Sequence, residues 1–116
     1  MHSRGERIKK VLIKELSDII QHKVKDPRIQ GIISVTHVDL SQDYKYAKIY
    51  ISIYGEHEVK KEVMEAIQES GSIIRGELGK RIRLRFTPEL RFYLDESAEK
   101  AERINDLLDK ISKGEL

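Results

Sequence analysis

Apolar residues recur along this chain at two spacings, and the change from one to the other predicts its helices and strands. Steps of three and four residues give a helix one apolar stripe, whereas alternation and β-branched runs are typical of strands. The cleanest alternation runs from Ala47 to Ile53, and an imperfect one before it predicts a β-bulge near Thr36-His37. In chain order, the pattern predicts a helix over 5–24, strands over 32–40 and 47–54, helical pieces over 58–67 and 73–79, a strand over 84–94 and a last helix over 97–111.

Local breakers mark where the predicted elements bend or end. Ser70-Gly71-Ser72 separates the two middle helical pieces and should break or bend the helix, because glycine and serine both weaken a helix interior. Gly79 is expected to end the second piece as a left-handed C-cap. Pro88 cannot donate to a sheet ladder, so the third strand is expected at an edge or a bulge.

These elements predict a single α+β domain, with a three-stranded sheet and helices packed on one face so that all the apolar stripes are buried together. At 116 residues the chain is long enough for one core and too short for two. The order α-β-β-α-kink-α-β is that of a KH domain of the type II arrangement, although no GxxG follows Ile67. We expect residues 1–94 to form the KH-like RNA-binding domain and residues 95–116 to form a C-terminal helix packed on it or extending from it. A monomer is expected, because no apolar stripe is left over.

The composition excludes several classes of function. The chain contains no cysteine, which removes disulfides, thiolate nucleophiles and most structural zinc sites. Its histidines are scattered without metal-ligand spacing, and no serine has a plausible histidine and acid partner. We therefore expect no catalysis, no metal and no cofactor. No apolar run reaches the roughly 18–20 residues of a membrane span, and MHSRGERIKK lacks the apolar core of a signal peptide, so we expect a cytoplasmic protein without a membrane partner.

Positive charge gathers at two places, although the formal net charge is only +2. One group surrounds the end of the second helical piece and the predicted third strand, and the other lies on the polar face of the first helix. Such clusters attract a phosphate backbone, and the restart of a kinked helix offers N–H groups to phosphate oxygens. For each residue alone, ordinary surface charge is the alternative. The predicted RNA-contacting residues are Arg75, Lys80, Arg81, Arg83 and Arg85 in the first group and Arg4, Arg7, Lys10 and Lys14 in the second.

Two other features leave alternatives open. Tyr50 and Tyr54 lie on the outer face of the second predicted strand, where they either pair with residues of neighbouring strands or stack on bases. From Asp95 onward acidic residues outnumber basic ones, so the C-terminal helix either shields the basic surface or docks on a protein.

Five segments, in order along nearly the whole chain, resemble the ribosome-binding factor A family. The family's kink reads alanine–any–glycine, and here that position holds Ser70-Gly71-Ser72, with the glycine in the middle. The matching segments are RIKKVLIKELSDIIQ (Arg7–Gln21), DPRI (Asp26–Ile29), VTHVDLSQDYKYAKIYIS (Val35–Ser52), IRGELGKRIRLR (Ile74–Arg85) and PELRFYLDES (Pro88–Ser97).

The resemblance implies a non-catalytic factor that binds the immature small ribosomal subunit through 16S rRNA and neighbouring ribosomal proteins. It implies a role in late maturation and processing of 16S rRNA, including its 5′-end helix, support for growth in the cold, and release helped by a GTPase. A KH-like protein–protein adaptor and a generic RNA chaperone are the alternatives. Reversing Arg81 and Arg83 to glutamate is expected to weaken subunit binding and to leave the fold intact.

Overall fold

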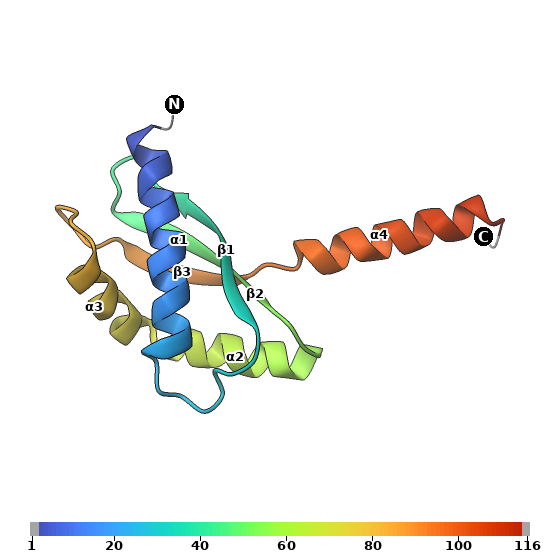
Figure 1. Ribbon diagram of the computed structural model, residues 1–116, viewed down its shortest axis with the longest axis horizontal. Coiled ribbons are helices and arrows are strands. Elements are labelled where there is room, and N and C mark those ends of the chain that lie inside the picture. The colour runs from blue at the N-terminus through green and yellow to red at the C-terminus, as the bar shows by residue number, and fades with distance from the viewer. Residues whose placement is uncertain (1–2, 115–116) are drawn as a thin grey trace.

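The computed structural model describes residues 3–114, in which three strands form one sheet and three helices cover one of its faces (Figure 1). A fourth helix extends away from the sheet. The α+β class and the predicted element order are confirmed. Residues 1–2 of the predicted domain 1–94 and residues 115–116 of the predicted C-terminal segment 95–116 lie outside the described residues. The elements are α1 (Arg4–His22), β1 (Ile33–Leu40), β2 (Tyr46–Ile53), α2 (His57–Glu69), α3 (Gly71–Arg81), β3 (Glu89–Leu94) and α4 (Ser97–Ser112).

β2 is the central strand of the sheet. It pairs antiparallel with β1 and parallel with β3, in the order β1-β2-β3. The register between β1 and β2 shifts between Val35 and His37, which confirms the predicted bulge. β3 is an edge strand that begins directly after Pro88, whose missing N–H would interrupt a ladder. Because parallel strands need a crossover connection, α2 and α3 lie between β2 and β3 in the chain.

The inward side chains of the strands and the stripes of α1, α2 and α3 form one core. The alternation that starts at Ala47 is buried at every second residue as far as Ile53. Burial of one leucine or isoleucine side chain contributes roughly 1.5–3 kcal/mol, so these residues hold the three helices on the sheet. The largest fully buried side chains are Leu12, Leu16, Ile19, Ile20, Val38, Ile49, Ile51, Ile53, Val63, Ile67, Ile74 and Leu78.

The helical stretch after the β1–β2 hairpin breaks at Ser70, as the sequence predicts. Ser70 is buried and lies between α2 and α3 with φ −90° and ψ 8°. Its N–H donates to the carbonyl oxygens of Ala66 (3.0 Å) and Ile67 (3.1 Å), and its own carbonyl accepts from Ile74 (3.0 Å). The backbone groups of the break are thus satisfied inside the protein.

The prediction that Gly79 is a left-handed C-cap is wrong. α3 continues through this residue and ends at Arg81. The glycine instead allows the loop after α3 to lie close to the helix, since a Cβ at position 79 would lie 2.9 Å from Oγ1 of Thr87. Close approach, rather than backbone conformation, explains the glycine.

The prediction that the third strand begins near residue 84 is also wrong. Residues 82–88 form a loop, so Leu84 and Phe86, which the alternation places on the inward face of that strand, lie outside the sheet. Arg75 of α3 donates to the carbonyl oxygens of Pro88 (3.0 Å) and of the residue before it (2.8 Å). These bonds hold the end of the loop against α3, and the proline cannot donate to β2.

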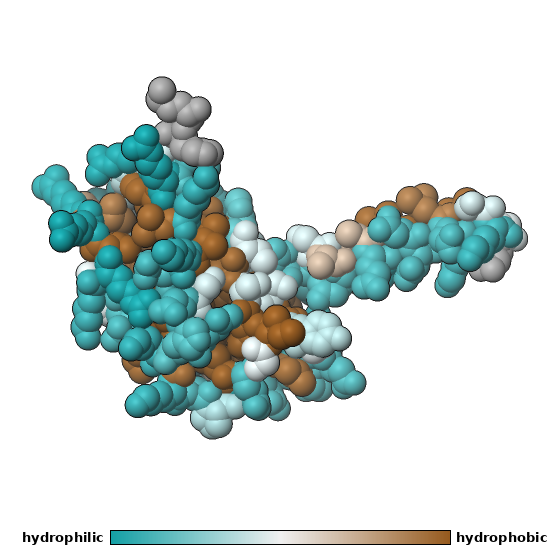
Figure 2. Space-filling view, in the orientation of Figure 1, coloured by the Kyte–Doolittle hydropathy of each residue, from teal (hydrophilic) through white to brown (hydrophobic). Residues whose placement is uncertain are grey.

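α4 projects from the sheet into solvent, so the prediction that every apolar stripe is buried is wrong for this helix (Figure 1). None of its described residues is buried. Apolar side chains are visible along one side of it in Figure 2. An apolar stripe is therefore left over on α4. The monomer was predicted because no such stripe was expected, so the sequence no longer supports that prediction. The exposed residues of the stripe are Ile104, Leu107, Leu108 and Ile111.

Two side-chain contacts hold the base of α4. Lys60 of α2 is buried and its ammonium lies 2.6 Å from a carboxylate oxygen of Glu99. Asp95 accepts hydrogen bonds from the N–H of Ser97 (2.9 Å) and from the hydroxyl of Thr36 in β1 (2.6 Å). These bonds tie the start of α4 to the sheet, although Asp95 is not its cap: the N-cap residue is Glu96, whose side chain makes no capping hydrogen bond.

Candidate nucleic-acid interface

The two predicted basic groups meet where the first half of α1 faces the loop after α3. Arg7 of α1 and Arg83 of the loop line one surface hollow of about 240 Å³. Figure 2 shows apolar surface on this side of the molecule, bordered by hydrophilic side chains. Two segments that are far apart in the sequence thus form one surface, which we call the α1–loop surface. The hollow is also lined by Ile8, Val11, Leu12, Arg81, Ile82 and Leu84.

α1 presents a strip of basic residues to solvent. Arg4, Arg7, Lys10 and Lys14 are all exposed. Spacings of three and four residues put the last three on one side of the helix. The guanidinium carbon of Arg4 lies 5.9 Å from the ring centroid of Tyr44, a cation–π contact that leaves the charge at the surface. The strip includes the arginine that borders the hollow.

Lys80 and Arg85 extend the basic surface beyond α3. The side chain of Lys80 is 75% exposed and lies 3.4 Å from a carboxylate oxygen of Glu77, which is a weak surface pair. The guanidinium carbon of Arg85 lies 5.5 Å from the ring centroid of Phe86, and the Lys45 ammonium lies 5.7 Å from the same centroid. The exposed ring of Phe86, which belongs to the loop, therefore has two cations close to it.

Arg81 is committed to acidic side chains of α1. One guanidinium nitrogen donates to Asp18 (2.6 Å) and Glu15 (3.1 Å), and the side chain is only 21% exposed. The hydrogen bond from Arg81, followed by that from His22, lowers the pKa of the Asp18 carboxyl below its usual value. Arg81 was predicted to contact RNA. In the structure it joins α1 to α3, and its guanidinium is engaged by Asp18 and Glu15.

Arg75 of α3 also makes contacts within the protein, in this case with the end of the loop after α3. Its guanidinium donates to the backbone carbonyls of Thr87 and Pro88. The side chain nevertheless remains exposed and lines a second hollow with Ser72 and Phe86. Arg75 therefore shapes the loop that carries Arg83 and Arg85, and its charge remains at the surface.

The predicted kink lies away from the basic residues that border the hollow. Gly71 begins α3 and Arg81 ends it, so the kink and the end of α3 are roughly 15 Å apart along the helix axis. Ser70 is buried, whereas Ser72 is exposed. The structure therefore does not bring the Ser70-Gly71-Ser72 backbone to the same place as the α1–loop surface.

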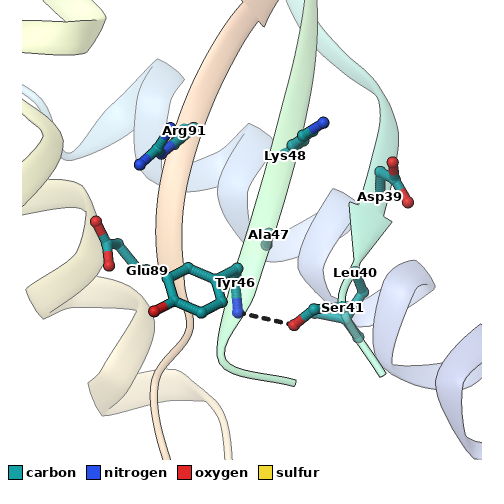
Figure 3. A pocket seen from close by; sticks show the side chains of 8 residues that line it. All are labelled: Asp39, Leu40, Ser41, Tyr46, Ala47, Lys48, Glu89 and Arg91. Carbon is teal, nitrogen blue, oxygen red and sulfur yellow. Dashed lines mark hydrogen bonds between the residues drawn. The ribbon is translucent and has the colours of Figure 1, made fainter. Parts of the chain in front are cut away.

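The opposite face of the sheet carries a second pair of cations (Figure 3). Lys48 of β2 and Arg91 of β3 are register partners, and Asp39 of β1 pairs with Lys48. Together with Glu89 they line a hollow of about 350 Å³. Two acids beside two bases make this face a weaker attractor of phosphate than the α1–loop surface.

Tyr50 pairs across the strands, which was one of the two alternatives for it. Its ring stacks on that of Tyr93, with centroids 5.6 Å apart and an interplanar angle of 29°, and lies 5.5 Å from the ring of His37 on the other side. Tyr54 follows the end of β2 and is 79% exposed. Tyr50 therefore contacts one ring on each neighbouring strand of the sheet.

The apolar part of the hollow was not among the predicted site residues. Val11 is 47% exposed, and Ile82 and Leu84 are half-buried beside Arg83. Periodicity assigns Val11 to the core stripe and Leu84 to a strand. The one available signal is the alternation of arginine with isoleucine and leucine over 81–84, which fits a strand equally well.

Neither a metal centre nor a membrane-spanning helix is found within residues 3–114. No group of three or more histidine or acidic side chains in this part of the chain is arranged to hold a metal ion. No helix in the same residues has both the length and the apolar character needed to cross a membrane.

The fold is shared by known structures of ribosome-binding factor A. The crystal structure of ribosome-binding factor A from Thermus thermophilus has a TM-score of 0.67 and 25% sequence identity, and the match covers 78% of this chain and 94% of that one. A homology model of the Thermus thermophilus factor, fitted into a cryo-EM map of a 30S–RbfA complex, has a TM-score of 0.62 and 26% identity. That match covers 76% of this chain and 91% of the other.

Sequence comparison agrees with the structural one. The ribosome-binding factor A of Moorella thermoacetica is 46% identical over 114 residues, which are 97% of this chain and 93% of that protein. The family model described as ribosome-binding factor A matches residues 4–108, from the start of α1 into α4. The chain therefore belongs to the ribosome-binding factor A family.

Proposed function

We propose that this chain is a non-catalytic assembly factor that binds the small ribosomal subunit through 16S rRNA. The observation that carries the proposal is the α1–loop surface, where exposed cations of α1 and of the loop after α3 lie around one hollow. Membership of the family supports ribosome binding, and a related factor from Thermus thermophilus has been fitted into a map of a 30S complex.

Arginine and lysine attract phosphates of any sequence, and this attraction weakens as salt rises because bound counterions are released. Arg7 and Arg83 have no ion pair or hydrogen bond from their side chains within residues 3–114, so they can turn to phosphate without breaking a protein contact. Arg75 and Arg81 support the surface through bonds to the loop and to α1. The residues proposed to contact RNA are Arg4, Arg7, Lys10, Lys14, Lys80, Arg83 and Arg85.

The proposal extends to the stage of assembly. The factor acts on immature subunits in the cytoplasm, favours the folded 5′-end helix of 16S rRNA, aids processing of the precursor ends and supports growth in the cold. It leaves the mature subunit with the help of a GTPase. These steps need a binder whose affinity depends on the shape of folded rRNA, and a rigid sheet with helices on one face provides a surface of fixed shape.

The proposal is tested by co-sedimentation with immature and mature small subunits, whole ribosomes and naked 16S rRNA at low and moderate salt. The Arg7→Glu/Arg83→Glu double variant is expected to lose binding to small subunits. The matched control is Lys48→Glu/Arg91→Glu, which reverses the same number of charges on the opposite face of the sheet and is expected to bind like the unaltered protein. Equal binding to all four substrates would instead indicate a generic RNA chaperone.

The exposed apolar face of α4 favours a second candidate function, a protein–protein adaptor. Ile104, Leu107 and Leu108 are each at least half exposed, as a helix awaiting a protein groove would be. An adaptor would stay bound to subunit proteins after the RNA is digested with nuclease. Loss of the complex on digestion would leave the RNA-binding function as the better explanation.

A further inference from the structure

The hollow of the α1–loop surface combines an apolar lining with arginines at its border. Arg7 and Arg83 lie on two separate segments, α1 and the loop after α3. Two of its lining residues are Leu12, which is fully buried, and Val11, which is half exposed. A simple phosphate-binding patch has no need of an accessible apolar lining, so the lining indicates a second component of the ligand.

We propose that this hollow takes the base of one unpaired RNA nucleotide, with the adjoining phosphates on Arg7 and Arg83. This inference rests on the proposed function and specifies how the same surface recognises RNA. An unstacked base is flat and apolar on its faces, and proteins commonly hold such a base against apolar side chains or the plane of an arginine guanidinium.

The size of the hollow favours a single ring system. Its volume is about 240 Å³, below the ~300–1,000 Å³ of pockets that bury drug-sized ligands. A paired duplex cannot place a base there, because its bases are stacked and hydrogen-bonded inside the helix. A looped or single-stranded segment can turn one base into the hollow and keep its backbone on the surrounding cations.

The charges around the hollow favour a nucleotide over an apolar peptide side chain. Three arginines line it, and the third, Arg81, is neutralised by Asp18 and Glu15. Two guanidinium groups therefore keep a positive charge that an apolar side chain would leave without a partner. A nucleotide matches both parts of the surface, since it has an apolar ring and an anionic phosphate.

Neutral changes to the lining separate this inference from simple charge attraction. In the Val11→Ser/Leu84→Ser variant the charges are kept and the apolar lining is reduced. The probe is an RNA hairpin with an unpaired loop containing 2-aminopurine, compared with a fully paired duplex of equal length. We expect the variant to bind the hairpin about tenfold more weakly and the duplex with unchanged affinity.

Val59→Ser is the matched control, because Val59 is a valine on α2 with a similar exposure, 43% against 47% for Val11. Far-UV circular dichroism and Tm show whether each variant is folded. A second measurement uses the unaltered protein: ultraviolet crosslinking of a hairpin with 4-thiouridine in its loop, followed by mass spectrometry. Crosslinks are expected in the peptides that contain residues 7–12 and 82–84.

The outcomes distinguish this inference from the proposed function. If Arg7→Glu/Arg83→Glu abolishes binding while the serine variant binds the hairpin normally, the surface binds RNA and the base-binding hollow is refuted. If the arginine variant still binds small subunits, the proposed RNA surface itself is refuted. Crosslinks that avoid both peptides, or a serine variant that loses only a nuclease-resistant protein complex, would also overturn the inference.

Discussion

At the scale of single residues, two arginines two positions apart serve different purposes. Arg81 donates to Asp18 and Glu15 and is mostly covered. Arg83 is exposed on the loop and borders the hollow. Charge at the first position holds two helices together, whereas charge at the second is available to a ligand.

Arg81→Glu is expected to lower Tm, because it puts a third carboxylate beside Asp18 and Glu15 in place of their shared partner. Arg83→Glu is expected to melt close to the unaltered protein and to change RNA binding alone. Thermal melts followed by circular dichroism measure both. Adding Asp18→Arg to Arg81→Glu should recover part of the loss, since the pair is then restored in the opposite sense. Identical melting of the two single variants would show that the ion pair does not stabilise the fold.

This difference between the two arginines could not be predicted from the sequence. The local pattern identified both as basic positions near a helix end, and the structure places them there. The expectation that both could be reversed without harm to the fold overlooked Asp18, which lies on another helix far away in the chain. Pairing of that kind is decided by how α1 and α3 pack, and residue spacing does not report it.

At the scale of elements, α3 contains two interior glycines with different surroundings. A Cβ at Gly76 would have nothing within 4 Å, whereas one at Gly79 would lie 2.9 Å from Oγ1 of Thr87. Glycine is the less stable choice in a helix interior unless the space is needed. Only the second glycine has such a reason.

Gly76→Ala is expected to raise the free energy of unfolding by about 0.5–1 kcal/mol, because alanine restricts the unfolded chain and fits the helix. Gly79→Ala is expected to gain less than this or to destabilise, because Thr87 and its loop must move. Urea denaturation of both variants provides the measurement. An equal gain for the two would show that the loop yields without cost.

Asp95 joins α4 to the sheet through hydrogen bonds to its carboxylate. The bonds from the side chain of Ser97 and from Thr36, followed by the Ser97 N–H, lower the pKa of Asp95 from 3.8 to about 2. A carboxyl whose pKa is lower in the folded state stabilises the protein above its unfolded pKa. This contribution is lost as the pH falls through the folded value.

Asp95→Ala is therefore expected to destabilise the protein by about 1 kcal/mol near neutral pH, because the hydrogen bonds from Thr36 and Ser97 are lost. The difference from the unaltered protein should stay constant down to about pH 4 and shrink between pH 4 and pH 2. Denaturation midpoints at several pH values measure it. A difference that persists at pH 2 would mean that the carboxylate charge is not what matters.

Most helices and strands could be predicted from the sequence, because the apolar residues that form the core recur at helical or strand spacing within each element. The bulge near Thr36-His37 and the break at Ser70 followed from local chemistry. The start of β3 did not, since alternation over 84–94 fits either one long strand or a loop and a short strand. Hydrogen bonds from Arg75 of α3 decide between the two, and they exist only in the folded chain.

At the scale of the whole molecule, α4 gives the protein an elongated shape, with Cα extents of 57 × 40 × 17 Å. Its apolar stripe was predicted, but its exposure was not. A periodic stripe indicates that a helix face can be covered without showing what covers it. The ion pair between Lys60 and Glu99 fixes the base of this projection.

Deletion of residues 97–116 is expected to leave a cooperatively folded domain, because no described residue of α4 is buried. The domain should lose on the order of 1–3 kcal/mol, because the Lys60 ammonium would lose its ion pair with Glu99. Lys60→Met in the shortened chain should restore most of this loss, and the same change in the full chain should not stabilise it. Chemical denaturation gives all four values, and a shortened chain that fails to fold would contradict the expectation.

The parallel pairing of β2 with β3 has a consequence for the growing polypeptide. β1 and β2 are neighbours in sequence and can pair as soon as both have been synthesised, whereas β3 must wait for the two helices between. Contacts between distant segments form late, because closing the intervening loop costs entropy first. Until β3 arrives, the central strand has an open edge that another nascent chain can pair with. The interval between synthesis of β2 and docking of β3 is therefore when this protein is most vulnerable to misassembly.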